Sequence, residues 1–382
     1  MSVSMTSKQR LWATIRHQEP DRVPISPRYY DYLLGVEGCH CWMHYLRFGE
    51  KMGIDPILTI EPKWHNYLLR HAGPYDDLPG VKVEMEVSNE RERTLVRRRF
   101  KTPAGDLTDV RQIPTRESLI TFDHMIEFPV KSRADLEKLP FILPKPETAY
   151  MGDVIATRDL AGERGLVECR PTQGTDQFLV DAVGVEGAFL LYYDDREMLK
   201  ELVRIFNQHT QAIMRRALEA GAEMIFDAWY NASMSVGWSP AQFRELFLPH
   251  IRANVELTHS YRAIYHYYDD GKMDKTLEPL AEAGVDVVET LSPPPMGDVD
   301  LASAKARIGD RVCLKGNVDQ VNVILPGTPA EIREAVRQTV AAAAAGGGFI
   351  LSTSDSIRPE TPWENVAAFF DAAKELARKA YG

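Results

Sequence analysis

Residues 263–283 have the sequence AIYHYYDDGKMDKTLEPLAEA, in which a short apolar run is followed by polar residues and then by an amphipathic segment. The run 263–268 has the length and aromatic content of a buried β-strand, and 274–283 has the spacing of a helix. The same order recurs through the second half of the chain. Strands are predicted over 223–228, 263–268, 285–289, 312–315 and 349–352, and the helices that follow them over 239–260, 274–283, 301–308, 329–345 and 362–380.

Five successive strand–helix units predict parallel strands joined by crossover helices. The strands are apolar without alternation, which is typical of a sheet covered on both faces. This pattern fits a barrel or an open, doubly wound sheet. The glycine run 346–348 follows a helix and precedes a strand, so it indicates a helix stop and not the phosphate-binding turn of a dinucleotide fold. We therefore predict a single (β/α)8 TIM-type barrel.

The first half of the chain is less regular. Between 81 and 112 the residues alternate as in antiparallel strands, with a turn signal at 103–105, which predicts an N-terminal β-hairpin excursion on the barrel. We expect one domain over 1–382. Helices are predicted over 8–17, most of 32–52, 153–165 and 177–220, and strands over 22–26 and 166–170.

Composition narrows the class of protein. The chain has 382 residues, 44% hydrophobic and 26% charged, which is typical of a globular protein. No apolar run reaches the roughly 18 residues of a membrane span, and the first residues lack the apolar core of a secretory signal. Four cysteines are too few for a disulfide framework. We expect a cytoplasmic protein without a membrane partner. The net charge of −10, without a basic stripe, argues against a nucleic-acid partner.

The carboxyl ends of barrel strands and the loops after them form the functional face of such folds. Four of the five units carry a carboxylate there. One such acid is more often a helix cap or a solvated loop residue, but several aimed into one cavity need a cation, a proton or a substrate donor. The residues predicted to face one cavity are Asp227, His266, Asp270, Glu289 and Asp355.

The segment 266–271, HYYDDG, is the densest signal. Because strand side chains alternate, His266, Tyr268 and Asp270 share one face. An imidazole, a phenol and a carboxylate on an inward face suit acid–base chemistry or metal binding. The alternative is a core histidine followed by an Asp-Asp-Gly turn. The spacing of Cys39 and Cys41 does not match the common zinc-binding patterns. On a helix, their side chains would also point about 200° apart.

Several motifs then resemble one family. They are MTSKQR at 5–10, EPDRVP at 19–24, GVD at 284–286, PMGD at 295–298, LKGNVD at 314–319, GGGFILS at 346–352 and PWEN at 362–365. Together they are similar to the uroporphyrinogen decarboxylase (URO-D) superfamily over essentially the whole chain. The resemblance implies a barrel enzyme of one of two chemistries, tetrapyrrole decarboxylation or cobalamin-dependent methyl transfer.

The decarboxylase branch implies an Arg-Gln-Ala-Gly-Arg stretch after the first strand. Here that place holds SPRYYD at 26–31, in which only Arg28 and Asp31 are stand-ins. The methyltransferase branch implies zinc held by His-x-Cys after one strand and by Cys after the last. Those places fall on Tyr268, Asp270 and the neighbourhood of Asp355. All the soft ligands are replaced by oxygen donors, which favours a harder ion or a differently built zinc site.

The resemblance thus implies a methyltransferase-like enzyme that moves a methyl group from a small O- or N-methyl substrate to cobalamin on a partner corrinoid protein. Its alternatives are a URO-D-like lyase and a non-catalytic binding barrel. A divalent metal, zinc or a harder ion and not ligated by cysteine, is predicted at His266, Asp270 and Asp355. The predicted catalytic residues are Asp227, His266, Tyr268 and Glu289, and the predicted substrate-binding residues are Arg28, Tyr29, Tyr30 and Asn317.

Overall fold

The computed structural model describes residues 4–38, 41–62, 80–115 and 124–381. The chain divides into two compact units, which we name after their sheets. The parallel-sheet unit consists of Met1–Pro62, Met151–Thr172 and Met214–Gly382, and the antiparallel-sheet unit of Lys63–Tyr150 and Gln173–Ile213. The expectation of one domain over the whole chain stays a prediction.

The parallel-sheet unit contains seven strands, and all strands that are neighbours in the sheet run parallel. Their carboxyl ends therefore meet at one edge of the sheet. In sheet order the strands are β1 (Ile57–Ile60), β6 (Leu166–Cys169), β7 (Met224–Ala228), β8 (Ile264–Tyr268), β9 (Val287–Thr290), β10 (Cys313–Val318) and β11 (Phe349–Thr353).

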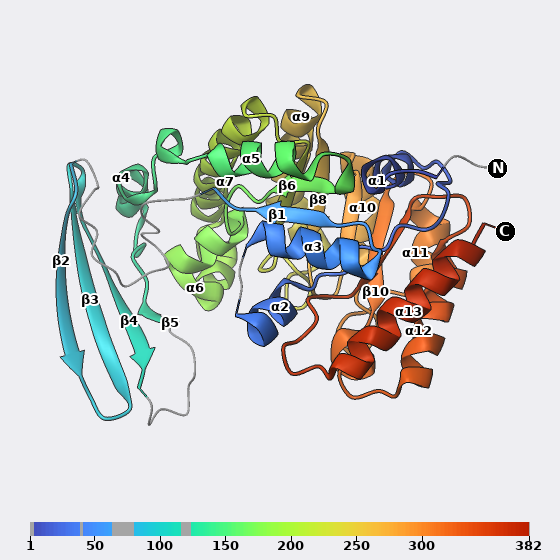
Figure 1. Ribbon diagram of the computed structural model, residues 1–382. Helices are drawn as coiled ribbons and strands as arrows, with labels where there is room; N and C mark the ends of the chain where they lie inside the picture. The colour runs from blue at the N-terminus through green and yellow to red at the C-terminus, as the bar shows by residue number, and fades with distance from the viewer. Residues whose placement is uncertain (1–3, 39–40, 63–79, 116–123, 382) are drawn as a thin grey trace. The chain divides into compact units, whose positions relative to one another are not determined.

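Helices follow the strands as the sequence predicted (Figure 1). Helix α9 packs on β8, and α12 packs on β10 and β11. Ser239 and Thr328 begin α8 and α12 with capping boxes, and a proline follows each of them. The helices of this unit are α1 (Ser7–Ile15), α2 (Tyr30–Glu37), α3 (Trp42–Met52), α5 (Gly152–Ala161), α8 (Pro240–Leu246), α9 (Leu248–Ser260), α10 (Leu277–Ala283), α11 (Leu301–Ile308), α12 (Pro329–Ala343) and α13 (Trp363–Lys379).

The parallel α/β architecture is confirmed, but the eight-stranded closure needs a correction. The segment predicted as the first strand, 22–26, makes one bridge, from Ile25 to Leu351 in β11. Pro24 lacks a backbone N–H, and the N–H of Ile25 donates to the carboxylate of Asp55 at 3.0 Å, so a ladder cannot extend here. The described residues form a curled, seven-stranded sheet and not a closed eight-stranded barrel. The sequence analysis also missed β1.

The core explains why the sheet curls. One apolar residue from each of the seven strands joins Leu11 and Ile15 of α1 in a single buried cluster. Only a curled sheet lets all seven strands contribute to one cluster. The strand residues are Ile57, Leu166, Met224, Ile264, Val287, Cys313 and Ile350.

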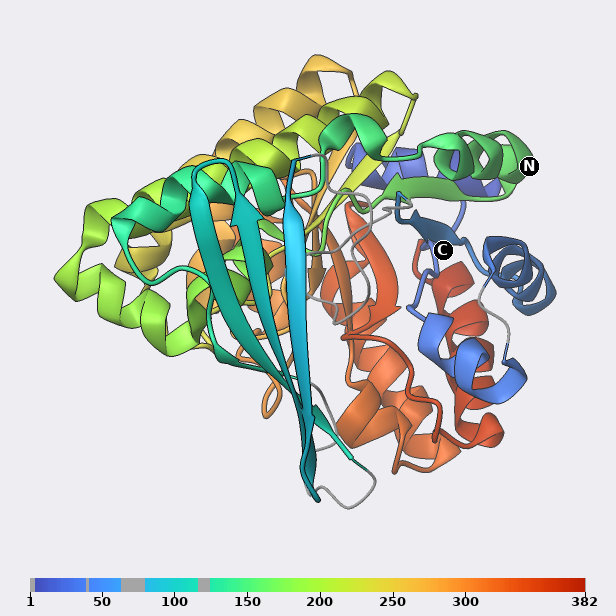
Figure 2. The ribbon, with the colours of Figure 1, turned by 90° about the vertical axis from the view of Figure 1, so that its left-hand side faces the viewer.

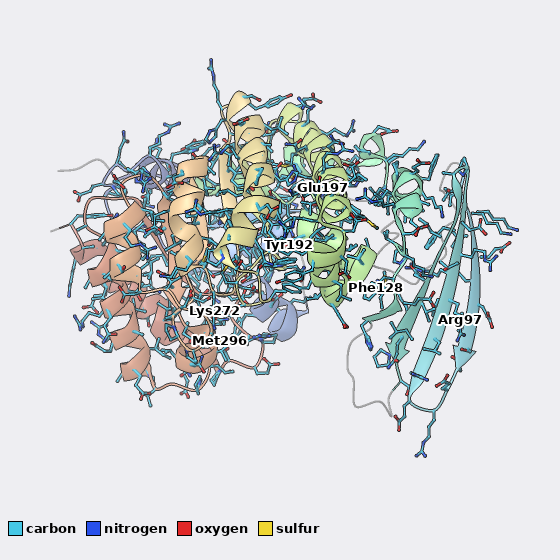
Figure 3. The ribbon with its side chains drawn as sticks, turned by 180° about the vertical axis from the view of Figure 1, so that it is seen from behind. Arg97, Phe128, Tyr192, Glu197, Lys272 and Met296 are labelled. Carbon is cyan, nitrogen blue, oxygen red and sulfur yellow. The ribbon has the colours of Figure 1, made fainter. Side chains whose placement is uncertain are left out.

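The antiparallel-sheet unit contains the predicted β excursion, seen in Figure 2 as a sheet of long strands. In β3, Arg97 is exposed on one face (labelled in Figure 3), whereas Arg98 is buried on the other face in an ion pair with Asp109. The strands are β2 (Lys82–Asn89), β3 (Arg93–Thr102), β4 (Gly105–Pro114) and β5 (His124–Glu127). Helices α4 (Leu139–Ile142) and α6 (Thr175–Asp194) belong to this unit, and α7 (Arg196–Glu219) has residues in both.

Within the described ranges, no helix has the length and apolar character that crossing a membrane requires.

Candidate active site at the carboxyl ends of the parallel strands

The inward face of the parallel sheet is built in layers. The apolar cluster lies at the amino-terminal ends of the strands, and because side chains alternate, the residues two positions further along share its face. At those positions the sheet becomes polar. We call Glu168, His266, Glu289 and Lys315, together with Arg28 from the segment before α2, the charged layer.

His266 lies between two carboxylates of the charged layer. Its Nδ1 is 2.7 Å from Oε2 of Glu168, and its Nε2 is 3.1 Å from Oε2 of Glu289. The hydroxyl of Thr59 donates to the other oxygen of Glu168 at 2.6 Å. The side chains of His266, Glu168 and Glu289 are all buried. Both ring nitrogens therefore face carboxylates, which fixes the imidazole in the centre of the sheet.

Glu289 is the hub of the charged layer. Arg28 Nη2 donates to its Oε2 at 2.5 Å, and Lys315 Nζ donates to its Oε1. Burial by itself would raise the pKa of Glu289, but the charges of Arg28 and Lys315 hold it well below its ordinary value. Burial would likewise raise the pKa of Glu168, and His266 and then Arg28 lower it. Both carboxylates are therefore ionised and compensated.

Above the charged layer, nearer the strand ends, lie two phenols and two carboxylates: Tyr230, Tyr268, Asp270 and Asp355, which we call the mouth group. The hydroxyl of Tyr268 donates to Oδ1 of Asp355 at 2.7 Å. The rings of Tyr230 and Tyr268 are 5.5 Å apart, edge to face. Although solvent reaches Asp270, its protein surroundings and then the charge of Asp355 raise its pKa to about 6.

Two arginines flank the rings of Phe226, Tyr230 and Tyr268, which we call the aromatic wall. The guanidinium of Arg28 lies 4.5 Å from the ring centre of Phe226 and 4.8 Å from that of Tyr268. Arg170 lies 5.6 Å from the ring of Tyr230 and pairs with Glu61 at 3.1 Å. These stacked contacts hold the rings in place, since cations are attracted to aromatic faces.

The loops after β8 and β9 support this edge. Asp298 accepts hydrogen bonds from the backbone of Met273 and Asp274, at 2.9 and 3.0 Å. A side chain at Gly297 would meet the carbonyl oxygens of Ser292 and of Gly271. Lys272 and Met296, which mark the two loops, are labelled in Figure 3. The PMGD motif therefore has a structural role, in which Asp298 fixes the loop that carries Asp270.

Four acids and one histidine were predicted to face one cavity, and one of them, Asp227, faces the other side of the sheet. His266 and Glu289 lie on the inward face, and Asp270 and Asp355 lie at its edge. The carboxylate of Asp227 instead accepts from Tyr265, Asn254 and Trp229 at 2.6, 2.9 and 3.0 Å. Asn254 belongs to α9, so Asp227 points toward the helices. The reason is the two-residue alternation, which turns Phe226 inward and its neighbour outward.

All four predicted substrate-binding residues have partners within the protein, and those of Arg28 are Glu289 and Glu168. Tyr29 donates to the carbonyl of Tyr45 at 2.9 Å, and Asn317 donates to that of Leu291 at 3.0 Å. Tyr30 donates to the carbonyl of Ile57, at the start of β1. The role of all four in substrate binding stays a prediction; Arg28 belongs to the charged layer and also contacts the ring of Phe226.

The predicted metal ligands do not form one group. Among the described residues, no three or more His, Cys, Asp and Glu side chains are arranged to hold a metal ion. His266 is engaged by two glutamates below the mouth group, while Asp270 and Asp355 lie above. Cys41 is exposed, Cys169 and Cys313 are buried, and Cys39 lies outside the described residues.

The sequence analysis missed Glu168, Arg170, Tyr230 and Lys315. A signal existed for two of them: Glu168 and Lys315 are charged residues inside short apolar strands, where burial requires a partner. No comparable signal marks Arg170 or Tyr230. Both residues follow a strand, and an arginine or a tyrosine in a loop is commonly exposed to solvent, so neither residue type indicates a buried site.

Comparison with solved structures shows proteins of similar fold. The fold is similar to that of a methyltransferase from Methanosarcina mazei, with a TM-score of 0.62 and 17% identity over 97% of this chain and 99% of that one. A B12-independent methionine synthase from Shewanella sp. W3-18-1 gives a TM-score of 0.50 at 12% identity over 94% and 98%.

Curated relatives are named uroporphyrinogen decarboxylase. The protein of Pseudomonas aeruginosa strain LESB58 is 28% identical over 66% of this chain and 71% of its own length. That of Aeromonas salmonicida is 26% identical over 88% and 98%. The family model "Uroporphyrinogen decarboxylase (URO-D)" matches residues 178–376, more than half of the 382 residues. The chain therefore belongs to the uroporphyrinogen decarboxylase (URO-D) family.

Proposed function

We propose that the protein is a methyltransferase, which moves a methyl group from a small O- or N-methylated substrate to a corrinoid carried by a partner protein. The substrate binds at the mouth group, above the charged layer. The corrinoid supplies a cobalt centre that accepts the methyl group. The similarity of fold to a methyltransferase over nearly the whole of both chains supports this proposal.

One observation carries the choice between the two chemistries of the family. The family resemblance implies that tetrapyrrole decarboxylation uses fixed arginines to hold a substrate with many carboxylates. Here the one arginine in that stretch, Arg28, is paired with Glu289 at 2.5 Å and lies 3.7 Å from Glu168. A cation compensated by buried carboxylates attracts an anionic substrate weakly, so this site favours a substrate that is not a polycarboxylate.

The residues have separable tasks in this proposal. Glu289 and Glu168 hold Arg28 and His266 in place, and Arg28 in turn supports the ring of Tyr268. Tyr268 and Asp355 form a hydrogen-bonded pair that a substrate heteroatom can join at the mouth. Asp227, which faces α9, has no direct part in the chemistry. Positioning of this kind accounts for much of catalysis in preorganised sites.

A resident divalent metal does not fit the described residues. The zinc site of the methyltransferase branch would need a histidine at Tyr268 and cysteines at Asp270 and near Asp355, and these positions carry a phenol and carboxylates. Asp270 and Asp355 provide two carboxylates but no third ligand among the described His, Cys, Asp and Glu side chains. No step is assigned to a metal.

Methyl transfer can be tested by anaerobic incubation of the purified chain with cob(I)alamin and single methyl donors, either methyl ethers or methylated amines. The proposal expects loss of the cob(I)alamin absorbance together with the demethylated product by mass spectrometry. Glu289→Gln should lower this rate at least tenfold, whereas the surface variant Glu201→Gln should not change it.

The second candidate is a URO-D-like lyase, which the names of the curated relatives favour. Incubation with uroporphyrinogen, followed by chromatography of the porphyrin products, tests it in parallel. Decarboxylated products without any methyl transfer would replace the first proposal by the second. Inactivity in both assays, with ligands still bound, would point to a non-catalytic binding barrel.

A further inference from the structure

The charges of the two layers are balanced in different ways. In the charged layer, Glu289 pairs with Arg28 and Lys315, and Glu168 contacts His266. In the mouth group, the hydroxyl of Tyr268 is the one described hydrogen-bond partner of Asp355. Over the described ranges, no Lys, Arg or His side chain pairs with Asp270 or Asp355. Neither carboxylate of the mouth group therefore has a cation as its direct partner.

Aromatic rings border the same carboxylates. Tyr230 and Tyr268 are 5.5 Å apart, and Tyr268 is 5.1 Å from Phe226. Burial raises the pKa of both phenols. The charges of Arg170 and Arg28 lower the pKa of Tyr230, Arg28 lowers that of Tyr268, and the charges of Asp270 and Asp355 raise both. Both phenols are therefore neutral, and Arg28 and Arg170 already lie 4.8 and 5.6 Å from the ring centres of Tyr268 and Tyr230, which shows that these rings attract cations.

The arginines nearby do not supply the missing charge. Arg28 is compensated by Glu289, and Arg170 pairs with Glu61. The place where related methyltransferases would hold zinc thus offers a pair of carboxylates and aromatic rings. That donor set does not fit a zinc site, but carboxylates with aromatic faces are the means by which proteins bind alkylated ammonium ions.

We propose that the mouth group binds the positively charged nitrogen of an N-methylated ammonium compound, with Asp270 and Asp355 as its counter-charges and Tyr230 and Tyr268 as its aromatic contacts. This inference rests on the proposed function and selects the N-methyl over the O-methyl class of substrate. It assigns Asp270, Asp355 and Tyr230 as specificity-determining residues.

An ammonium substrate also suits the chemistry of the transfer. The carbon–nitrogen bond breaks and its electron pair stays on nitrogen, so that the cation becomes a neutral amine. The new bond to the methyl carbon uses an electron pair of the reduced corrinoid. A quaternary nitrogen needs no proton to leave, because it departs as a neutral tertiary amine. The amine then takes a proton from the solvent, after the transfer is complete.

Choline and its uncharged isostere 3,3-dimethylbutan-1-ol separate charge from shape. Isothermal titration of the full chain should give a Kd for choline at least about tenfold lower than that for the alcohol, and higher salt should weaken choline binding alone. Asp270→Asn, Asp355→Asn and Tyr230→Leu should each raise the choline Kd about fivefold or more. Asp310→Asn is the matched control, because this exposed acid lies before β10, at the other end of the sheet.

Several outcomes would overturn the inference. Equal affinity for choline and the alcohol would show that charge is not recognised. Unchanged choline binding in both carboxylate variants, with circular dichroism showing that they are folded, would place the cation elsewhere. Stoichiometric zinc binding that is lost in Asp270→Asn and that displaces choline would make the mouth group a metal site.

Failure of this inference differs from failure of the proposed function. If methyl ethers donate to cob(I)alamin while choline neither binds nor donates, methyl transfer stands and the ammonium class falls. If choline binds through Asp270 and Asp355 but no methylated compound donates a methyl group, the ammonium site stands and the proposed methyl transfer falls.

Discussion

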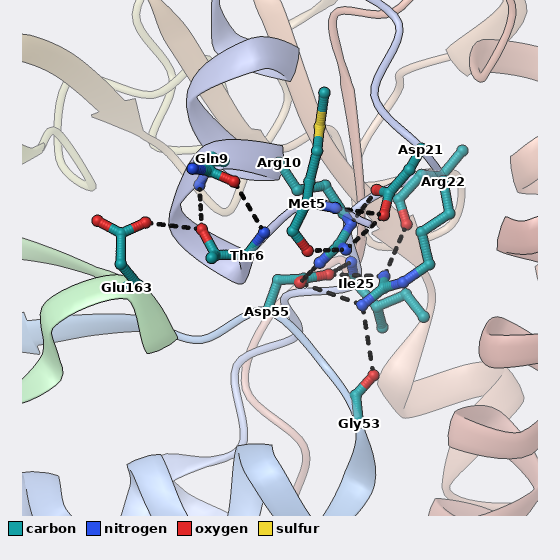
Figure 4. Close-up of polar contacts among 11 residues, drawn as sticks. Met5, Thr6, Gln9, Arg10, Asp21, Arg22, Ile25, Gly53, Asp55 and Glu163 are labelled. Carbon is teal, nitrogen blue, oxygen red and sulfur yellow. Dashed lines mark hydrogen bonds and ion pairs between the residues drawn. The ribbon is translucent and has the colours of Figure 1, made fainter. Parts of the chain in front are cut away.

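The carboxylate of Asp55 accepts a hydrogen bond from the backbone N–H of Ile25 at 3.0 Å, while the carbonyl of Ile25 accepts one from the backbone of Asp55 at 2.8 Å. Arg10 and Arg22 bind the same carboxylate, at 2.5 and 2.7 Å (Figure 4). Ile25 also bridges to β11, whereas Asp55 precedes β1. This one side chain therefore connects the two edges of the seven-stranded sheet.

Removal of the Asp55 carboxylate should lower the stability of the folded protein. Asp55→Ala would leave two arginines and a buried N–H without their acceptor, so we expect the free energy of unfolding in urea to fall by about 3–5 kcal/mol. Glu50→Gln removes an exposed ion pair with Arg164 and should cost less than about 1 kcal/mol. Similar losses in the two variants would show that Asp55 is not the connection.

Glu289→Gln should destabilise the protein by about 3–5 kcal/mol, because Arg28 and Lys315 would stay buried without their counter-charge. The pKa of Glu289 is lowered on folding, so its contribution is present above the ordinary value of 4.5 and is lost as the pH falls below it. Urea unfolding along a pH series should therefore show a shallower acid loss in the variant. A parallel loss in both proteins would contradict the assignment.

Asp270→Asn should stabilise the protein at a pH above the pKa of Asp270, in contrast to the destabilising Glu289→Gln. Folding raises the pKa of Asp270 from 3.8 to about 6, so the folded state binds the proton more tightly. Stability is then fully present below about pH 4 and falls as the pH rises toward about 6. The variant should melt at a higher temperature than the parent at about pH 8, with no gain at about pH 4. A variant less stable at about pH 8 would show that Asp270 has a cationic partner.

Asp227 should prove structural. Asp227→Ala leaves the donors of Tyr265, Asn254 and Trp229 without their acceptor, and we expect a loss of about 2–3 kcal/mol together with a change in tryptophan fluorescence. Asp227→Asn should bind choline with the affinity of the parent, because this side chain faces α9. A loss of choline binding in a stably folded Asp227→Asn would return the residue to the site.

Patterns within the sequence are sufficient to predict the parallel α/β class and the family. The five strands of the second half are short apolar runs, and capped amphipathic helices follow them, so local patterns specify each element. Alternation within 266–271 also predicted that His266 and Tyr268 share a face. These features depend on residues near one another in the chain.

Which side chains contact one another in the candidate site becomes visible in the folded structure. Glu168 and His266 meet because the sheet curls, and Arg28 reaches Glu289 across the inward face from a segment 261 residues away. Asp227 was predicted to lie with the other acids because four of the five predicted units carry a carboxylate at the strand end, while only the register of β7 shows which side it faces. Closure by Asp55 in place of a full eighth strand has the same origin: a side chain substitutes for ladder hydrogen bonds that Pro24 cannot make.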